Sequence, residues 1–483
     1  MRKIFALLFI SLLSCSKDKT PETIIFVESI TISGSNITSG NTSQMTANIL
    51  PENANDKTLA WSSSDVSIAV VSNNGLVTAK KNGTITITAT ATDKNTVKAT
   101  KQISISSFTI GIGESQEVNN ADELIIALAK IKAGGKIILN QGNYIFNSKI
   151  NITVSGTAEN KITLIGKEGQ NRPKLDFSSM SENSANQGII LAADYWHIKG
   201  IDIYKAGDNG MQIKGHNNLI EFCTFSECSD TGLQIDNGAS YNTILNCDSF
   251  FNADSSIENA DGFACKLTAG TGNKFKGCRA WQNLDDGWDG YLRGANNIET
   301  TYENCWAIKN GYLKNGTKGG GDGNGFKTGG SDLKDLKHNA IYKNCIAVGN
   351  VYDGFDHNSN RGIVTIFNCS AYDNGKNYSF SSTNPLAKLT IKNSNALGAY
   401  GSVAATILDV TNNSWQDGIN TTSDDFVSID YMQLLNARKA DGSLPDVTFF
   451  HLKAGSDLID RGINVGLPFN GVAPDLGAFE LID

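Results

Sequence analysis

The chain has 483 residues, which is enough for two or more domains. Its net charge is −8 and only 19% of its residues are charged, which argues against a nucleic-acid-binding protein, because such proteins carry a basic patch. Glycine is abundant and proline is scarce (48 against 7), and this favours many short strands whose backbone N–H groups are all needed for pairing.

The first residues have the features of a bacterial export signal. Two basic residues precede an apolar stretch, residues 4–13, that is too short to span a membrane. Leu12-Leu13-Ser14-Cys15 resembles a lipoprotein cleavage site, so we expect Cys15 to carry a lipid and residues 16–22 to form a polar tether. An ordinary secretory signal cleaved nearby is the alternative. We therefore expect an exported protein, either secreted or held at the outer membrane or cell surface through its lipid anchor alone.

Residues 23–107 form a first module. Short runs of alternating apolar and polar residues, separated by turns, predict a β-sandwich. Trp61-Ser62-Ser63-Ser64 and Asn74-Gly75-Leu76-Val77-Thr78-Ala79 resemble the bacterial immunoglobulin-like domains of group 2. This resemblance covers the whole segment and implies a spacer or an adhesion module. We interpret the segment as a spacer, because it contains no catalytic cluster.

A linker and one helix come next. Residues 108–120 are expected to be the linker and a first strand, and residues 121–132 have apolar residues at helical spacing. Asn119 or Asn120 is a candidate N-cap. A helix at this point would cover the open end of a repetitive core. The apolar positions of the predicted helix are Leu124, Ile125, Leu128 and Ile131.

The segment from about 136 to 405 repeats a short pattern, in which a small polar residue is followed by a glycine and a large apolar residue. The glycines recur at intervals of roughly 22 to 38 residues, a range typical of stacked coils. We predict an all-β domain over residues 108–405, a right-handed parallel β-helix. The pattern occurs at Asn209-Gly210-Met211, Thr231-Gly232-Leu233, Asp261-Gly262-Phe263, Asp286-Gly287-Trp288, Asn324-Gly325-Phe326 and Asp353-Gly354-Phe355.

Two columns of side chains follow from this repeat. Successive side chains of a strand point to opposite faces, so the residue after each inward apolar residue points outward. The column before the glycines contains Asp261, Asp286 and Asp353. The repeat therefore predicts aspartates and one lysine on one face of the solenoid. The outward column is Gln212, Gln234, Ala264, Asp289, Lys327 and Asp356.

The cysteines after Cys15 also occupy equivalent positions of successive coils. Stacked residues are about 4.8 Å apart, and buried thiols behave as small hydrophobic groups. We expect free, buried cysteines rather than disulfides, and no Cys-x-x-Cys pair indicates a metal site. The column contains Cys223, Cys247, Cys278, Cys305, Cys345 and Cys369. Beyond residue 405 the repeat weakens, and residues 406–483 are predicted to be a tail that packs along the β-helix.

The residues with the clearest chemistry lie between 259 and 330. Asp261 and Asp286 hold the same place on adjacent coils, Asp285 precedes one of them, and Asp289 points outward just beyond the turn. Four converging carboxylates repel one another unless a cation lies between them. Ligands that are all oxygen suit Ca²⁺ better than a transition metal. The alternative is a solvated acidic edge.

Lys327 lies in the column of Asp289, one coil further along. A nearby cation would lower the pKa of this lysine, and a neutral amine can act as a general base. Asp356 would have the opposite effect if it paired with the lysine. A cation and a base suit the β-elimination of a polyuronate, because the cation draws charge from the carboxylate while the base takes the C5 proton. The alternative is an ordinary surface lysine.

Three segments in this region carry a family resemblance. Asn259-Ala260-Asp261-Gly262-Phe263, Asp285-Asp286-Gly287-Trp288-Asp289 and Gly323-Asn324-Gly325-Phe326-Lys327 resemble, in this order, the family 9 polysaccharide lyases, which include pectate lyases. The likeness runs from about 115 to 400. It implies a calcium held by four aspartates and a lysine as the base. It also implies an acidic plant polysaccharide as substrate, polygalacturonate or rhamnogalacturonan. The matching residues are Asp261, Asp285, Asp286, Asp289 and Lys327.

Several alternative functions fit the sequence. A rhamnogalacturonan lyase of the same family would keep the elimination and change the polymer. A glycoside hydrolase on the same fold needs a paired acid and base, and it gives no role to Lys327. A non-catalytic glycan-binding protein or adhesin fits the anchor and the immunoglobulin-like module equally well. We expect a monomer. Residues near the site that we leave without a role are Lys266, Arg293, Asp356 and His357.

Overall fold

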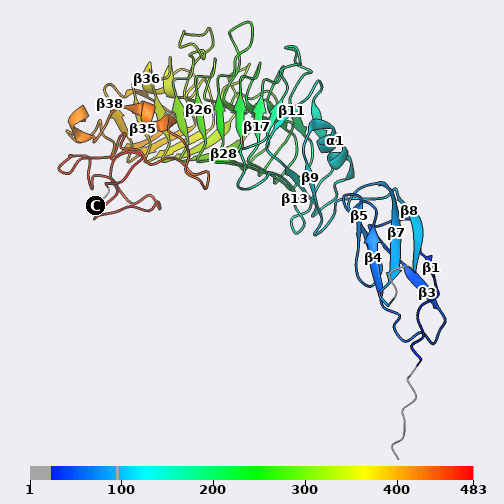
Figure 1. Ribbon diagram of the computed structural model, residues 1–483. Coiled ribbons are helices and arrows are strands. Elements are labelled where there is room, and N and C mark those ends of the chain that lie inside the picture. Colours follow the sequence, from blue (N-terminus) through cyan, green and yellow to red (C-terminus); the bar gives the residue numbers. More distant parts are fainter. Residues whose placement is uncertain (1–22, 94–96, 482–483) are drawn as a thin grey trace, which may run out of the picture. The chain divides into compact units, whose positions relative to one another are not determined.

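The computed structural model describes residues 23–93 and 97–481. The chain divides into two compact units, one ending at Thr109 and one beginning at Ile110 (Figure 1). The predicted leader, residues 1–22 with Cys15, lies outside the described residues. Within the described part of the chain, no helix is long and apolar enough to cross a membrane.

The first unit consists of short antiparallel strands. Its sheets have the orders β1-β3, β2-β6-β5 and β4-β7-β8. Trp61 on β4 packs against a core that includes Val27, Ala89 and Ala91. Gly75 has φ +79°, as the turn before β6 requires. The strands are β1 (Ser29–Ser33), β2 (Thr42–Gln44), β3 (Thr46–Leu50), β4 (Leu59–Ser63), β5 (Ala69–Val71), β6 (Leu76–Ala79), β7 (Gly83–Ala91) and β8 (Lys98–Ile105).

The second unit is a parallel β-helix, as the repeat predicts, and the structure shows that it has three sheets. The long sheet runs from β9 to β40, and its last strand lies just beyond the predicted boundary at residue 405. Its strands are β9 (Ser115–Val118), β10 (Lys136–Leu139), β13 (Ile162–Gly166), β16 (Trp196–Lys199), β19 (Leu219–Glu221), β22 (Thr243–Leu245), β25 (Asn273–Lys276), β28 (Ile298–Glu303), β31 (His338–Lys343), β34 (Ile363–Phe367), β37 (Lys388–Lys392) and β40 (Ile407–Thr411).

The second sheet of the β-helix, here called the tail-facing sheet, is the one that the C-terminal residues cover. Small alanines such as Ala280 and Ala307 alternate along it with large side chains such as Trp306. Its strands are β11 (Asn143–Ile145), β14 (Lys174–Asp176), β17 (Asp202–Tyr204), β20 (Thr224–Ser226), β23 (Asp248–Phe250), β26 (Arg279–Trp281), β29 (Trp306–Ile308), β32 (Ile346–Val348), β35 (Ser370–Tyr372) and β38 (Asn395–Leu397).

The third sheet, here called the site sheet, carries the repeated pattern. The register pairs Ala264 with Asp289, Asp289 with Lys327, and Lys327 with Asp356, so the predicted outward column is confirmed. Its strands are β12 (Ile150–Ile152), β15 (Ile189–Leu191), β18 (Met211–Ile213), β21 (Leu233–Ile235), β24 (Phe263–Cys265), β27 (Trp288–Asp289), β30 (Phe326–Lys327), β33 (Asp353–Asp356), β36 (Lys376–Phe380) and β39 (Gly401–Val403).

The inward column of the site sheet is an aromatic stack. Neighbouring rings have centroids 5.2, 4.7, 5.0 and 5.2 Å apart. Stacked rings add to the large apolar area that each buries, so the stack holds the coils in register beneath the outward column. The stacked residues are Phe263, Trp288, Phe326, Phe355 and Tyr378.

The glycine of the repeat is required by close packing of the coils. A Cβ built on Gly287 would lie 2.6 Å from the carbonyl oxygen of Gly325, and one on Gly325 would lie 2.6 Å from that of Gly354. Real Cβ atoms do not approach backbone oxygens so closely, so a side chain at these positions would push the coils apart.

A ladder of buried asparagines lies beside these glycines. The side chain of Asn252 donates to that of Asn283 at 2.8 Å, and Asn283 donates to Asn310 at 3.0 Å. The ladder continues from Asn310 to Asn350 at 3.0 Å. Because buried amides must be hydrogen-bonded, the ladder fixes the turns between the tail-facing sheet and the site sheet.

The helix of the second unit, α1 (Ala121–Lys130), packs against β9 and β10 at the first coil, where its predicted role as an end cover places it (Figure 1). Asn120 is the N-cap and accepts a hydrogen bond from the backbone N of Glu123 at 3.0 Å. Leu124 is buried as predicted, but Ile125 is 46% exposed. The predicted apolar face is too wide at this position, because only a narrow face of the helix meets the core.

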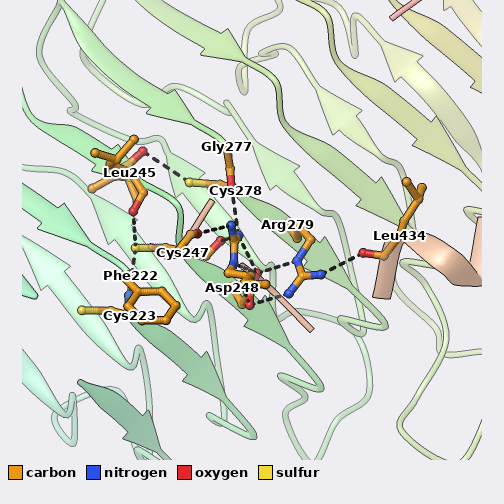
Figure 2. A network of polar contacts seen from close by, with 12 residues as sticks. Phe222, Cys223, Leu245, Cys247, Asp248, Gly277, Cys278, Arg279 and Leu434 are labelled. Atoms are coloured by element: carbon orange, nitrogen blue, oxygen red, sulfur yellow. Dashed lines mark hydrogen bonds and ion pairs between the residues drawn. The ribbon is translucent and has the colours of Figure 1, made fainter. Parts of the chain in front are cut away.

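The cysteine prediction is confirmed for the described cysteines, all of which are free and buried. The thiols donate weak hydrogen bonds to backbone carbonyls, as Cys247 does to Leu245 at 3.4 Å. Figure 2 shows Cys223, Cys247 and Cys278 from successive coils beside one another. Burial raises the pKa of the Cys265 thiol to about 11, so this thiol stays protonated and unreactive.

The C-terminal residues pack on the tail-facing sheet, as predicted. They include two short 3₁₀ turns, Ser423–Asp425 and Tyr431–Leu435, and their core contains Phe426, Phe449 and Phe450. In Figure 1 the C-terminal residues, orange to red, lie beside β35 and β38. Trp306 belongs to the same cluster, in agreement with a packing role for this tryptophan.

An ion-pair network attaches this tail to the sheet. The guanidinium of Arg279 donates two 2.8 Å hydrogen bonds to Asp248 and another of 2.9 Å to the carbonyl of Leu434 (Figure 2). Arg438, from the tail, reaches Asp248 at 2.7 Å. Burial would raise the pKa of Asp248, but the two arginines outweigh burial and hold it below its usual range.

Candidate active site

Three buried aspartates occupy the turns that lead into β24 and β27. Asp261 precedes β24, and Asp285 and Asp286 precede β27. One carboxylate oxygen of each lies within 4.8 Å of the others. The register of these strands, Phe263 opposite Trp288, places Asp261 and Asp286 at the same position of adjacent coils, as the repeat predicts.

Asp286 lies at the centre of this cluster and is fully buried. Its Oδ1 accepts hydrogen bonds from the backbone N of Asn324 at 2.8 Å and from the Asn324 side chain at 2.9 Å. Its Oδ2 accepts no hydrogen bond of good geometry, although Lys327 Nζ lies 3.1 Å away. A buried carboxylate oxygen with so little compensation is costly, and it is available to a further cation.

The other two carboxylates also accept hydrogen bonds, and Asp261 Oδ1 accepts one from the backbone N of Asp286 at 3.3 Å. Asp261 Oδ2 accepts from Lys266 Nζ at 2.7 Å and from Thr231 Oγ1 at 3.0 Å. Asp285 Oδ1 accepts from the backbone N of Gly323 at 3.4 Å and from that of Asp322. Backbone, hydroxyl and lysine donors thus fix the orientation of both carboxylates within the cluster.

Asp289 lies beside the three-carboxylate cluster rather than within it. Its Oδ1 accepts from the backbone N of Tyr291 at 3.0 Å. Lys266 Nζ lies 3.4 Å from its Oδ2, and Lys327 Nζ lies 3.7 Å from its Oδ1. Burial would raise the pKa of Asp289, but Lys327 and Lys266 outweigh burial and hold it below its usual range.

Lys327 points into the carboxylates and is 8% exposed. Besides Asp286, its Nζ lies 3.1 Å from Asp322. Burial favours the neutral amine, but Asp286, Asp289, Asp285 and Asp322 outweigh it, so the pKa of Lys327 lies well above its usual range. The sequence predicts a lowered pKa for Lys327 beside a bound cation. The carboxylates by themselves raise the pKa of this lysine instead.

The three carboxylates of the cluster resist ionisation, since the pKa values of Asp261, Asp285 and Asp286 are all raised. Burial, followed by the charge of Asp261, raises the pKa of Asp285 to about 7. Burial and the charge of Asp285 raise the pKa of Asp286 well above its usual range. Like charges held in a buried site have this effect unless a cation compensates them. Perturbed groups of this kind mark functional sites.

The residues present fit a calcium ion. The cluster offers only carboxylate oxygens, the ligand type that Ca²⁺ prefers. The orphaned Oδ2 of Asp286 lies among them. Asp261, Asp285 and Asp286 would hold the ion, with Asp289 at its side.

Sequence reasoning does not reach every residue of the site. Asp322 pairs with Lys327, but it comes from the glycine-rich segment between two strands, where no periodicity fixes a register. Lys266, left without a role by the sequence, forms ion pairs with Asp261 and Asp289. Asn324 orients Asp286, and its place before Gly325 in the repeat is the signal that could identify it.

Other nearby residues have structural partners. Arg293 pairs with Asp332 at 3.2 Å, and both side chains are well exposed. His338 is buried and bonds to the carbonyl of Gly290 at 2.8 Å. Asp356 is not within ion-pair distance of Lys327 among the contacts of the described residues, although burial and Asp353 raise its pKa to about 7.

A polar cleft of about 590 Å³ continues from the cluster toward the preceding coils. Lys266 lines this cleft and also contacts Asp261, so it connects the two. The other lining residues include Glu182, Gln187, Asp208, Asn209, Asp230, Asp236 and Asp254. The site is therefore an open groove along the site sheet, a shape that suits a polymer.

Fold and site together define a class, the parallel β-helix polysaccharide lyases. Residues 111–395 match the family described as "Pel9A-like, right handed beta helix region", and residues 26–103 match "Bacterial Ig-like domain (group 2)". The chain belongs to the Pel9A-like family, the family 9 pectate lyases. The predicted fold class, with a right-handed β-helix and an immunoglobulin-like domain before it, is confirmed.

Individual relatives agree with this assignment. Pectate lyase L of Dickeya dadantii is 37% identical over 372 residues, which cover 73% of this chain and 84% of that protein. The crystal structure of pectate lyase Pel9A superposes with a TM-score of 0.69 at 36% identity and covers 74% of this chain and 90% of that one. A rhamnogalacturonan lyase gives a TM-score of 0.63 at 25% identity and covers 70% and 97%.

Proposed function

We propose that the chain is a calcium-dependent pectate lyase that cleaves polygalacturonate by β-elimination, with Lys327 as the general base. Membership of the family makes it a polysaccharide lyase for an acidic substrate. The observation that carries the metal and the base is the placement of Lys327 Nζ 3.1 Å from the orphaned Oδ2 of Asp286, inside a cluster of carboxylates.

When bound, calcium supplies the positive charge that neutralises the aspartates and attracts a uronate carboxylate. Asn324 and Lys266 keep the ligand carboxylates oriented through the contacts described above. Once the ligand aspartates are compensated, the main cause that raises the pKa of Lys327 is weakened, and its amine becomes available as a base.

The chemical step then balances without water being consumed. Lys327 Nζ takes the proton from C5 of the uronate, and the electron pair of that C–H bond forms the C4–C5 double bond. The C4–O bond breaks and its oxygen leaves with the electron pair, taking a proton from solvent. Lys327 returns its proton to solvent before the next turnover.

Activity is tested by ultraviolet absorbance of the unsaturated product, with polygalacturonate and rhamnogalacturonan as separate substrates, each with calcium and with chelator. We expect calcium-dependent product from polygalacturonate. Product only from rhamnogalacturonan would transfer the assignment to the second candidate, which the similarity to a rhamnogalacturonan lyase supports. No product from either polymer would favour the glycan-binding alternative.

We also propose that the protein is exported, anchored through a lipid on Cys15, and monomeric. The leader residues support export, as set out above, and the immunoglobulin-like unit would act as a spacer. Lipid labelling and membrane fractionation of the wild type and of Cys15→Ser test the anchor, which predicts loss of label and release from membranes in the variant. Light scattering of the mature chain tests the monomer.

A further inference from the structure

The cleft beside the active site contains a second group of carboxylates that the proposed chemistry does not use. Asp208 and Asp230 line this cleft, and Asp208 is only 9% exposed. Both residues stand two positions before a glycine of the repeat, where Asp285 stands in the first cluster. The register of β18, β21, β24 and β27 keeps these positions in one column.

The arrangement repeats that of the first cluster. There, Asp285 adjoins Asp261 and Asp286 from the column next to the glycines. Here, Asn209 comes from that same column and its side chain contacts Asp208, and Asp230 holds the place of Asp208 on the next coil. Coils rise by about 4.8 Å each, so the second group lies two coils, or about 10 Å, toward the N-terminus.

The side chain of Asn209 gives independent evidence for a ligand-binding site. Its side chain is 5% exposed, and its Oδ1 is buried without a hydrogen-bond partner. Its Nδ2 donates to Asp208 Oδ2 at 3.1 Å. The reverse orientation of the amide would bring two acceptors together, so the free atom is the carbonyl oxygen, which is a ligand that Ca²⁺ accepts in proteins.

The carboxylates also keep oxygens without donors. Asp208 Oδ2 accepts from Gln187 Nε2 at 2.8 Å, and Asp230 Oδ1 accepts from the backbone N of Thr231 at 2.7 Å. Among residues 23–93 and 97–481, no donor within hydrogen-bond distance is found for Oδ1 of Asp208 or Oδ2 of Asp230.

The cations that line the cleft are engaged elsewhere. Lys266 pairs with Asp261 at 2.7 Å and with Asp289 at 3.4 Å. Arg293 pairs with Asp332 at 3.2 Å. Neither forms an ion pair with Asp208 or Asp230 in the described part of the chain. An acidic polymer crossing this cleft would meet carboxylates that have no ion-pair partner and would be repelled.

We propose that Asp208, Asn209 and Asp230 form a second calcium site, two coils before the first. The three residues line the cleft from adjacent coils and offer oxygen ligands, and a bound ion would leave coordination positions free for a further ligand. Resting on the proposed function, we assign this ligand to a carboxylate of a second uronate unit of the same bound polymer. The acidic cleft would then attract the substrate instead of repelling it.

Isothermal titration of the substrate-free chain with CaCl₂ tests the site directly. We expect two ions for the wild type and one for Asp208→Asn/Asp230→Asn. The matched control is Glu182→Gln/Asp254→Asn, which removes two charges from the same cleft outside the group and should keep both ions. Circular dichroism checks that each variant is folded. Asn209→Asp adds a charged ligand and should tighten the second site about tenfold, a gain that misfolding cannot produce.

The outcomes separate the two proposals. A wild type that binds one ion, lost in Asp286→Asn and kept in Asp208→Asn/Asp230→Asn, overturns the second site and leaves the proposed function standing. Loss of the second ion in the control variant also overturns the second site, because the overall negative charge of the cleft would then explain the binding. One ion that survives in Asp286→Asn but disappears in Asp208→Asn/Asp230→Asn overturns the metal placement of the proposed function instead.

Kinetics tests the assigned role. Asp208→Asn/Asp230→Asn should raise the KM for polygalacturonate severalfold and leave kcat close to that of the wild type, because the site binds substrate away from the bond that breaks. A fall in kcat with unchanged KM would contradict this role.

Discussion

Two regions of the β-helix bury aspartates in opposite ways. On the tail-facing sheet, Asp248 is held by Arg279 and Arg438, and its pKa is lowered. On the site sheet, Asp286 is more deeply buried, keeps an oxygen without a hydrogen bond, and has a raised pKa. The same scaffold therefore neutralises a buried carboxylate with arginines where the C-terminal tail is attached. It leaves a carboxylate oxygen without a hydrogen bond where a ligand is to bind.

The largest effect is expected at Lys327. Lys327→Ala should lower kcat by about 10²- to 10⁴-fold, the usual contribution of a general base, because the proton acceptor is lost. Product absorbance with polygalacturonate measures it. Lys314→Ala, at an exposed lysine, serves as the control. Calcium binding should persist in Lys327→Ala, and an active variant would refute the assignment of the base.

A large loss of stability is expected when the compensated aspartate is changed. Asp248→Asn should lower the free energy of unfolding by about 3–5 kcal/mol, because it leaves the buried charges of Arg279 and Arg438 without a partner. Denaturant titration of the wild type and the variant measures the change. A loss below about 1 kcal/mol would mean that the tail is held by its apolar contacts alone.

The matching change at the uncompensated aspartate should behave differently. Asp286→Asn should leave the calcium-free fold at least as stable as the wild type, because one of several repelling charges is removed. Calcium affinity should fall at least about tenfold, since an ionic ligand is lost. Thermal melting with chelator and with calcium measures both effects. Equal stabilisation of variant and wild type by calcium would place the ion elsewhere.

A smaller effect concerns pH. The pKa of Asp285 is raised from 3.8 to about 7, so the unfolded chain loses this proton at lower pH than the folded chain. The stability of the calcium-free protein should therefore fall as pH rises from about 4 to about 7, by up to about 1.4 kcal/mol per pH unit for this group. Denaturation in chelator across this range measures the slope, which Asp285→Asn should reduce. A slope unaffected by this substitution would assign the effect to other groups.

The sequence predicts the residues that belong to the repeat, but not the partners that come from irregular segments. The repeat fixes which side chains share a column, so Asp261, Asp286, Asp289 and Lys327 could be placed from the spacing of the glycines. The partners from irregular segments could not. Asp322 lies in a glycine-rich turn, and Arg438 lies in the tail, far from Asp248 in sequence. Neither segment has a period, so nothing local indicates which coil it reaches.

The glycines of the repeat have a consequence for how the surface of such a protein can change over evolutionary time. Because no side chain fits between the coils at these positions, the residues on either side are held at fixed points of a regular grid. A substitution there exchanges one functional group for another without moving its neighbours. Single substitutions can therefore add, remove or move charges in the groove one position at a time. The substrate that the groove binds can change in this way on an unchanged backbone.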